Sequence, residues 1–176
     1  MKKLSIVLIL FVSLFLVTGC KKEEVKQVVE EPKKPVNLKE VTENIFKANL
    51  DEDGNIIINE KDITKKASYI SYEYEGVTIG LLAVRNSKGK VIVVVNTCQS
   101  CGGSPWAYFV QDGDDIQCQN CGNYFAIDDL NNLEPDGCNP IGIEKRTDKD
   151  GKIIIGIEQL KELKDKFENW RGPRAQ

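Results

Sequence analysis

The sequence contains no histidine and a single methionine, and these two shortages exclude several kinds of site. Without histidine there is no Ser-His-Asp triad, no histidine-ligated zinc hydrolase site, no CxxCH haem attachment and no Rieske cluster with its two histidine ligands. With only the initiator methionine, a methionine-rich copper site is excluded as well. Metal chemistry in this chain must therefore rest on thiolates or carboxylates, and the chain has six cysteines.

Basic residues are missing from a long internal stretch. Between Lys90 and Lys145 there is no Lys or Arg, whereas Asp and Glu recur from Asp112 onwards. An acidic region without a basic stripe is a poor candidate for binding nucleic acid, so no nucleic-acid partner is expected. The length of 176 residues and the hydrophobic content of 41% suit one domain of ordinary size.

The N-terminus has the pattern of an export signal. Lys2 and Lys3 precede the apolar run Leu4–Val17, which has the length of a signal h-region and is short for a transmembrane helix. Small residues then directly precede Cys20, and this resembles the lipobox of bacterial lipoproteins. The resemblance implies that residues 1–19 are removed and that lipid on Cys20 anchors the protein to a cell membrane on its extracytoplasmic face. An ordinary signal peptide, or an anchor helix with a chance cysteine, are the alternatives.

The segment after the lipobox is predicted to be a tether. Residues 20–45 contain equal numbers of Lys and Glu, two prolines and no aromatic residue. High charge with little apolar content cannot bury a core, so an extended connection is expected. The folded, metal-binding domain is then predicted to occupy residues 46–176.

The rest of the chain predicts a mainly β fold. Runs rich in Val, Ile and Tyr alternate with turn signals, and they place strands at 54–58, 66–74, 77–84, 90–95, 106–110 and 151–157. The consecutive middle runs predict an antiparallel meander. One C-terminal helix is expected over residues 158–170, because Leu160, Leu163, Phe167 and Trp170 share one face that we expect to pack in the core.

Two cysteine pairs share the pattern CxxCG. Cys98 and Cys101 form the first pair, Cys118 and Cys121 form the second, and sixteen residues separate the pairs. A CxxC turn presents both sulfurs to one metal ion, and the glycine that follows permits a positive φ that aims backbone amides at the thiolates. Two such knuckles, as in zinc ribbons, make a tetrahedral site of four sulfurs. This ligand set suits zinc, mononuclear iron or an iron–sulfur cluster.

Two other fates are open to these cysteines. In an oxidising compartment they could form disulfides, as a metal-free state of the same site or as its final form. A thioredoxin-like role is less favoured, because a reactive thiolate needs a nearby cation or helix N-terminus and the surrounding sequence has no Lys or Arg. Cys138 is left over from the two pairs, and it is interpreted as a fifth ligand, an exchange ligand or a buried structural thiol.

These motifs together resemble the FtrD-like family of membrane iron–sulfur proteins, over Asp62 to Phe167. The segments that carry the resemblance are the aromatic-rich strand at 67–74, the strand into the first CxxC at 91–101, CQNCGNYF at 118–125, DGCNPIG at 136–142 and the strand and helix from 152 onwards. Asp136 stands where the family usually has glycine, and Gly142 where it usually has proline. The second knuckle is also similar to the Rieske cluster loop, with cysteine in place of histidine.

The resemblance implies a membrane-tethered accessory protein that binds an iron–sulfur cluster or iron. Such a protein would pass electrons or metal to a membrane protein of an iron-uptake or redox system. A zinc ribbon that serves only as an interaction module, and a thiol–disulfide protein, are the alternatives. The sequence offers no nucleophile–base pair and no phosphate-binding loop, so an electron carrier or metal-binding accessory is favoured over a catalyst.

Overall fold

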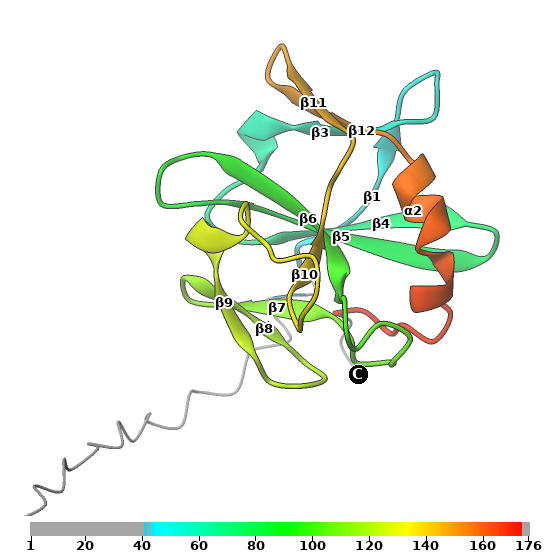
Figure 1. The fold of residues 1–176 in the computed structure, drawn as a ribbon. Helices are drawn as coiled ribbons and strands as arrows, with labels where there is room; N and C mark the ends of the chain where they lie inside the picture. Colours follow the sequence, from blue (N-terminus) through cyan, green and yellow to red (C-terminus); the bar gives the residue numbers. More distant parts are fainter. Residues whose placement is uncertain (1–40, 42, 174–176) are drawn as a thin grey trace, which may run out of the picture. The chain divides into compact units, whose positions relative to one another are not determined.

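The computed structural model describes residues 41 and 43–173, and strands dominate them (Figure 1). The strands are β1 (Ile45–Lys47), β2 (Asn49–Leu50), β3 (Ile56–Asn59), β4 (Ser68–Tyr74), β5 (Val77–Arg85), β6 (Val91–Cys98), β7 (Phe109–Asp112), β8 (Asp115–Cys118), β9 (Tyr124–Ala126), β10 (Pro140–Gly142), β11 (Arg146–Lys149) and β12 (Lys152–Ile155). The helical pieces are short, namely η1 (Glu60–Asp62), η2 (Ile127–Asp129), α2 (Glu158–Glu162) and η3 (Lys164–Lys166). The prediction of a mainly β domain is confirmed.

A five-stranded sheet forms the centre of the domain, in the order β1-β4-β5-β6-β10. Strands β4, β5 and β6 pair antiparallel in sequence order, which confirms the predicted meander. The tight β4–β5 turn has positive φ at Glu75 and Gly76, as a two-residue hairpin loop requires. The edge strand β1 is parallel to β4, and the short β10 is antiparallel to β6.

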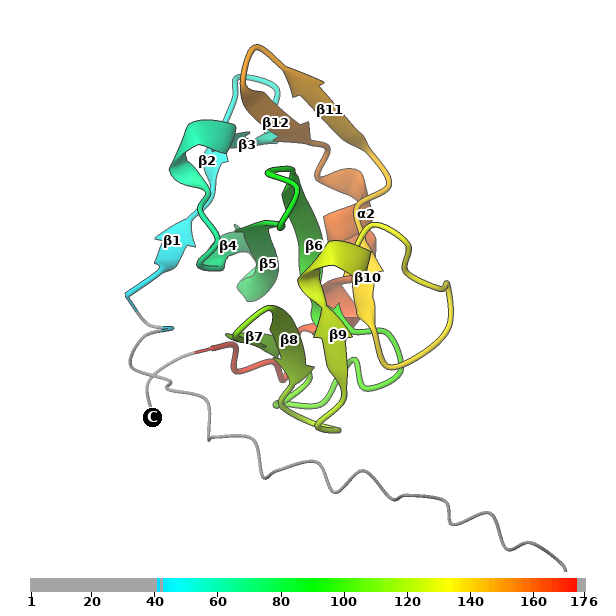
Figure 2. The same cartoon turned by 90° about the vertical axis from the view of Figure 1, so that its left-hand side faces the viewer.

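Two smaller sheets cover the central one, as Figure 2 shows. The four-stranded sheet has the order β11-β12-β3-β2, and its central pair is rich in isoleucine, with Ile56 opposite Ile155. The three-stranded sheet has the order β7-β8-β9 and is built from two hairpins. The first strand of this sheet, β7, overlaps the strand predicted at 106–110.

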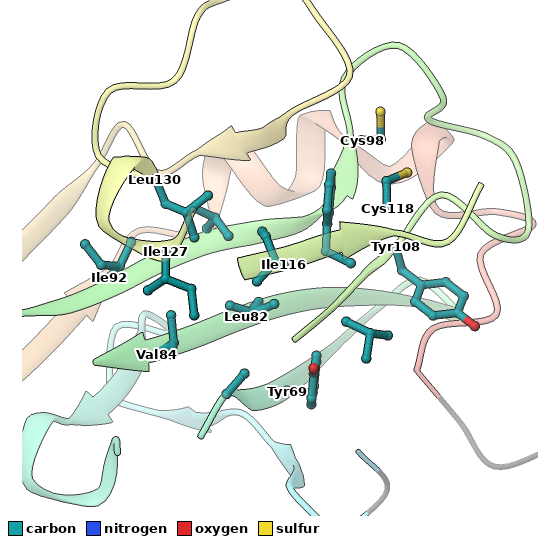
Figure 3. Close-up of a cluster of buried hydrophobic side chains, with 14 of the residues drawn as sticks. Tyr69, Leu82, Val84, Ile92, Cys98, Tyr108, Ile116, Cys118, Ile127 and Leu130 are labelled. Atoms are coloured by element: carbon teal, nitrogen blue, oxygen red, sulfur yellow. The ribbon is translucent and has the colours of Figure 1, made fainter. Parts of the chain in front are cut away.

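The core is divided into two clusters by the alternation of side chains along the central strands. In β6, Ile92, Val94 and Cys98 belong to one cluster, which also contains Tyr108 and Phe109 (Figure 3). The odd-numbered valines of β6 belong to the other, with isoleucines of β3 and β12 and the C-terminal Leu160 and Phe167. Cys98 therefore faces the three-stranded sheet, which carries the second cysteine pair.

The C-terminal helix is shorter than the sequence predicts. The expected helix over residues 158–170 is present only as α2, followed by the 3-10 turn η3. From Leu163 onwards the backbone pairs three residues back, as in a 3-10 turn, and the Lys166 carbonyl, which a continued helix would offer to Trp170 N–H, accepts from Gly103 N–H at 3.0 Å. Leu160 and Phe167 are nonetheless buried, so the apolar face packs in the core as expected.

The described region begins within the expected tether. Val41 is buried, and β1 begins at Ile45, the residue predicted to end the tether. Residues 1–40, with the predicted signal and Cys20, lie outside the described residues. Within the described part of the chain, no helix has the length and apolar character needed to cross a membrane.

Candidate metal centre

The two cysteine knuckles start at the ends of two strands that the fold brings together. Cys98 is the last residue of β6, and Cys118 is the last residue of β8. Cys118 stands opposite Phe109 in the β7–β8 hairpin, and Phe109 N–H donates to the buried Asn96 side-chain oxygen in β6 at 2.8 Å. This buried hydrogen bond aligns the ends of both strands, and nothing in the local sequence around Asn96 indicates it.

Each knuckle turns back toward its own first cysteine. In the first, Cys101 N–H donates to the Cys98 sulfur at 3.4 Å. In the second, Gly122 has a φ of 77° and its N–H donates to the Cys118 carbonyl at 2.8 Å. The expected positive φ after each pair is confirmed for Gly122 but wrong for Gly102, since the residue with positive φ in the first knuckle is Gly103.

Four sulfurs converge to form the candidate metal centre. The Sγ atoms of Cys98, Cys101, Cys121 and Cys138 all lie within 4.8 Å of one another. Cys118 is outside this group of four, although its thiol is buried beside Cys98 (Figure 3) and affects the pKa of both Cys98 and Cys121. The five cysteines singled out in the sequence thus meet in one place, with Cys138 rather than Cys118 completing the closest set of four.

Cys138 reaches the centre because its loop is hydrogen-bonded to the first knuckle. Gln99 N–H donates to the Asn139 carbonyl at 3.0 Å, and Ser100 N–H donates to the Gly137 carbonyl at 3.1 Å. The Cys98 thiol also donates to the Cys138 carbonyl at 3.2 Å. The segment DGCNPIG, singled out in the sequence, contains this loop's cysteine, but the pairing across about 40 residues had no local signal.

The thiols differ in exposure and in acidity. Cys98 and Cys118 are buried, Cys101 and Cys138 are half-buried, and Cys121 is exposed. Burial raises the pKa of Cys98, and it raises that of Cys118 to about 11. Partial burial alone would raise the pKa of Cys121, but the Asn123 N–H and the neighbouring thiols stabilise its thiolate, so its pKa is lowered. The Cys121 side of the centre is therefore the side exposed to solvent.

Lys166 is a neighbour of the centre that the sequence did not reveal. Its ammonium group donates to the Gln99 carbonyl at 3.2 Å, and its side-chain stem passes within about 3.0 Å of the position a Cβ on Gly102 would take. Arg171 stacks over Trp106, 5.0 Å from the ring centre. Basic side chains thus lie beside the first knuckle although the surrounding sequence has none, because the C-terminal segment folds back over this knuckle.

The donor set fits a thiolate-bound metal. Four thiolates at about 2.3 Å from one ion place their sulfurs about 3.8 Å apart. The observed upper limit of 4.8 Å is close to that value, so only small movements would complete a tetrahedral site. A set of four cysteines suits zinc, single iron or an iron–sulfur cluster.

Comparison with solved structures gives a distant likeness. A quaternary ammonium Rieske monooxygenase, CntA, in complex with an inhibitor matches with a TM-score of 0.39 and 14% sequence identity. The match covers 69% of this chain and 34% of that one, so the chain spans about a third of the monooxygenase's length. No curated protein matches the chain.

Comparison with protein families gives a direct match over most of the folded region. The model described as "Membrane iron-sulfur containing protein FtrD-like" matches residues 61–167, from η1 to the end of the C-terminal turns. That span contains both knuckles and Cys138. With the family match and the four converging thiols, the chain belongs to the FtrD-like family of membrane iron–sulfur proteins.

Proposed function

We propose that Cys98, Cys101, Cys121 and Cys138 bind iron, as a single ion or within an iron–sulfur cluster, and that the protein transfers electrons to or from a membrane protein. The observation that carries this proposal is the convergence of four sulfurs within 4.8 Å in a chain of an iron–sulfur family. The partner would belong to an iron-uptake or redox system, and lipid on Cys20 would hold the protein at the membrane.

The position of the centre supports a redox role over a structural one. A structural zinc site typically supplies the folding energy that a small domain lacks, but this domain buries two apolar clusters of its own. The cysteines sit at the boundary of one cluster, with Cys98 buried on the protein side and Cys121 exposed on the other. Buried Tyr108 and Phe109 pack in the same cluster as Cys98 and limit water on that side, while the exposed Cys121 leaves the centre accessible to a partner.

Metal delivery is a second candidate, and the fifth thiol favours it. A tetrahedral site needs four thiolates, and Cys118 stands next to the four as an additional donor. A spare thiol beside an exposed ligand provides a path for ligand exchange, in which Cys118 loses its proton as it binds the ion and the ion passes between donors without becoming free. Electron transfer and delivery differ in one measurable property, namely whether the bound metal leaves when an acceptor is present.

Elemental analysis with an absorption spectrum tests the proposal directly. The protein is purified without oxygen in mild detergent, and iron, zinc and acid-labile sulfide are measured per chain. We expect iron, with visible charge-transfer bands that bleach reversibly on reduction, and labile sulfide if a cluster is present. A colourless protein with stoichiometric zinc, after anaerobic reconstitution with iron has also failed, would contradict the redox proposal and support the zinc-ribbon alternative.

A further inference from the structure

A groove opens directly beside the candidate metal centre. It has a volume of about 520 Å³, and Cys138 lies on its wall. The other walls come from β9 and from the loop that connects η2 to β10. The groove therefore leads to one of the four converging sulfurs from the outside of the protein.

The groove combines carboxylates at its rim with apolar side chains on its walls. Asp129, Glu134 and Asp136 are exposed, whereas Phe125 and Leu133 are half-buried. Among the described residues that line it there is no Lys or Arg. Half-buried apolar walls inside an acidic rim are the features of a protein-docking surface with one sign of charge.

Hydrogen bonds connect the loop that lines the groove to the first knuckle. The Gln99 side chain donates to the Glu134 carbonyl at 3.0 Å, and the Asn139 side chain donates to the same carbonyl at 2.8 Å. The Ser100 hydroxyl donates to the Gly137 carbonyl at 2.6 Å. A molecule seated in the groove would therefore rest on a loop that is fixed to the Cys98–Cys101 turn and that carries Cys138 itself.

We propose that this groove docks a basic, partly apolar polypeptide segment of the partner protein. Complementary charge would orient Lys or Arg side chains toward Asp129, Glu134 and Asp136, while an apolar side chain contacts Phe125 and Leu133. A hydrated metal cation would use the carboxylates but not the apolar walls. A second copy of this acidic chain would meet like charge. The proposal rests on the proposed function only in that the docked partner exchanges electrons or metal with the centre.

The test uses the full chain in non-ionic detergent, loaded with zinc so that NMR signals stay sharp and redox activity is not needed. A lysine-rich peptide that contains one tryptophan is titrated in, with a glutamate-rich peptide of equal length as control. We expect the largest amide shifts at residues 123–126 and 129–139. The triple variant Asp129→Asn/Glu134→Gln/Asp136→Asn should weaken peptide binding about tenfold at low salt.

A matched variant controls for net charge. Glu52→Gln/Asp53→Asn/Asp150→Asn removes the same number of exposed charges from hairpin turns on the four-stranded sheet. It should change peptide affinity by less than about twofold, because the screened charges there lie outside the groove. Equal losses in the two variants, or peptide shifts centred on another face, would overturn the proposal. So would hexaamminecobalt(III) binding the groove as tightly as the peptide, which would indicate a cation-entry path instead.

The proposed function and the docking proposal are tested by different measurements, so either one can fail alone. Metal analysis decides whether the centre holds iron, and the titration on zinc-loaded protein decides whether the groove binds a basic segment. Peptide binding without iron would leave the docking surface in place and remove the redox role. Iron with reversible redox chemistry but no peptide binding in the groove would support the redox role and overturn the docking proposal.

Discussion

Among single residues, Cys138 and Cys118 give the sharpest test of the ligand set. Because the Cys138 sulfur lies among the closest four and Cys118 does not, Cys138→Ser should lower metal affinity at least about tenfold. Cys118→Ser should retain most of the affinity. Competition with a chromophoric chelator measures both variants under the same conditions. The opposite order of affinities would show that the four cysteines of the two CxxC pairs hold the metal, as the sequence predicts.

The order in which the thiols react is a second consequence of their surroundings. Cys121 is exposed and has a pKa below its usual value of 9.0, whereas Cys98 and Cys118 are buried with raised pKa values. In metal-free, reduced protein, iodoacetamide should therefore label Cys121 first and the two buried thiols last. Peptide mapping by mass spectrometry at several times gives the order. Early labelling of Cys98 would show that the metal-free knuckles open.

The raised pKa values also predict how the metal-free protein responds to alkaline pH. Folded Cys118 keeps its proton up to about pH 11, whereas the unfolded chain releases it from 9.0 upward. The folded state then binds more protons than the unfolded state, so stability falls as pH rises through this window. Urea unfolding between these limits should show the decline, and Cys118→Ala should reduce its slope. A slope unchanged by the variant would contradict the assigned cause.

At the scale of elements, the local sequence pattern predicted the strands in the interior of the central sheet but not the short, exposed strands at the edges of the sheets. The meander β4–β5–β6 follows from long runs of Val, Ile and Tyr, because each strand is buried over most of its length. The short strands β1, β2 and β11 are mostly exposed, so burial imposes no apolar pattern on them, and β1 forms only by pairing with the distant β4. The helix was predicted too long because tertiary hydrogen bonds to the first knuckle replace its last turns.

The contact between the C-terminal segment and the sheet gives a prediction at this scale. A Cβ on Gly80 in β5 would lie 2.3 Å from the Trp170 ring, which stacks edge-on against Tyr108 and Phe167. Gly80→Ala should therefore displace Trp170 and lower the free energy of unfolding by about 1–3 kcal/mol. Gly142→Ala is the control, because a Cβ there meets no atom within 4 Å and its φ is not positive. Urea unfolding that shows equal stability for both would contradict the packing.

For the whole molecule, the sequence singled out the cysteines that lie together, but not which four of them lie closest. The CxxC spacing identifies two turns, and a turn is a local property of the chain. Whether Cys118 or Cys138 completes the closest four depends on how the loop from β9 to β10 is bonded to the first knuckle, and this joins residues about 40 apart. The position of Lys166 depends likewise on the fold of the C-terminal segment. Such long-range relations have no signature in local spacing.

The attachment of the whole molecule to the membrane is predicted to depend on one residue outside the described region. Because Cys20 follows a lipobox-like sequence, and lipid on this residue is expected to hold the protein at the membrane, Cys20→Ser should move the protein from the membrane fraction to the soluble fraction. Its metal content should not change, since the four converging sulfurs belong to other residues. Fractionation with metal analysis measures both properties, and Cys138→Ser is the matched control that should lose metal while remaining with the membrane. A Cys20→Ser protein that still partitions wholly with membranes would show that the chain is held there by its apolar N-terminal run or by a partner, and not by lipid on Cys20.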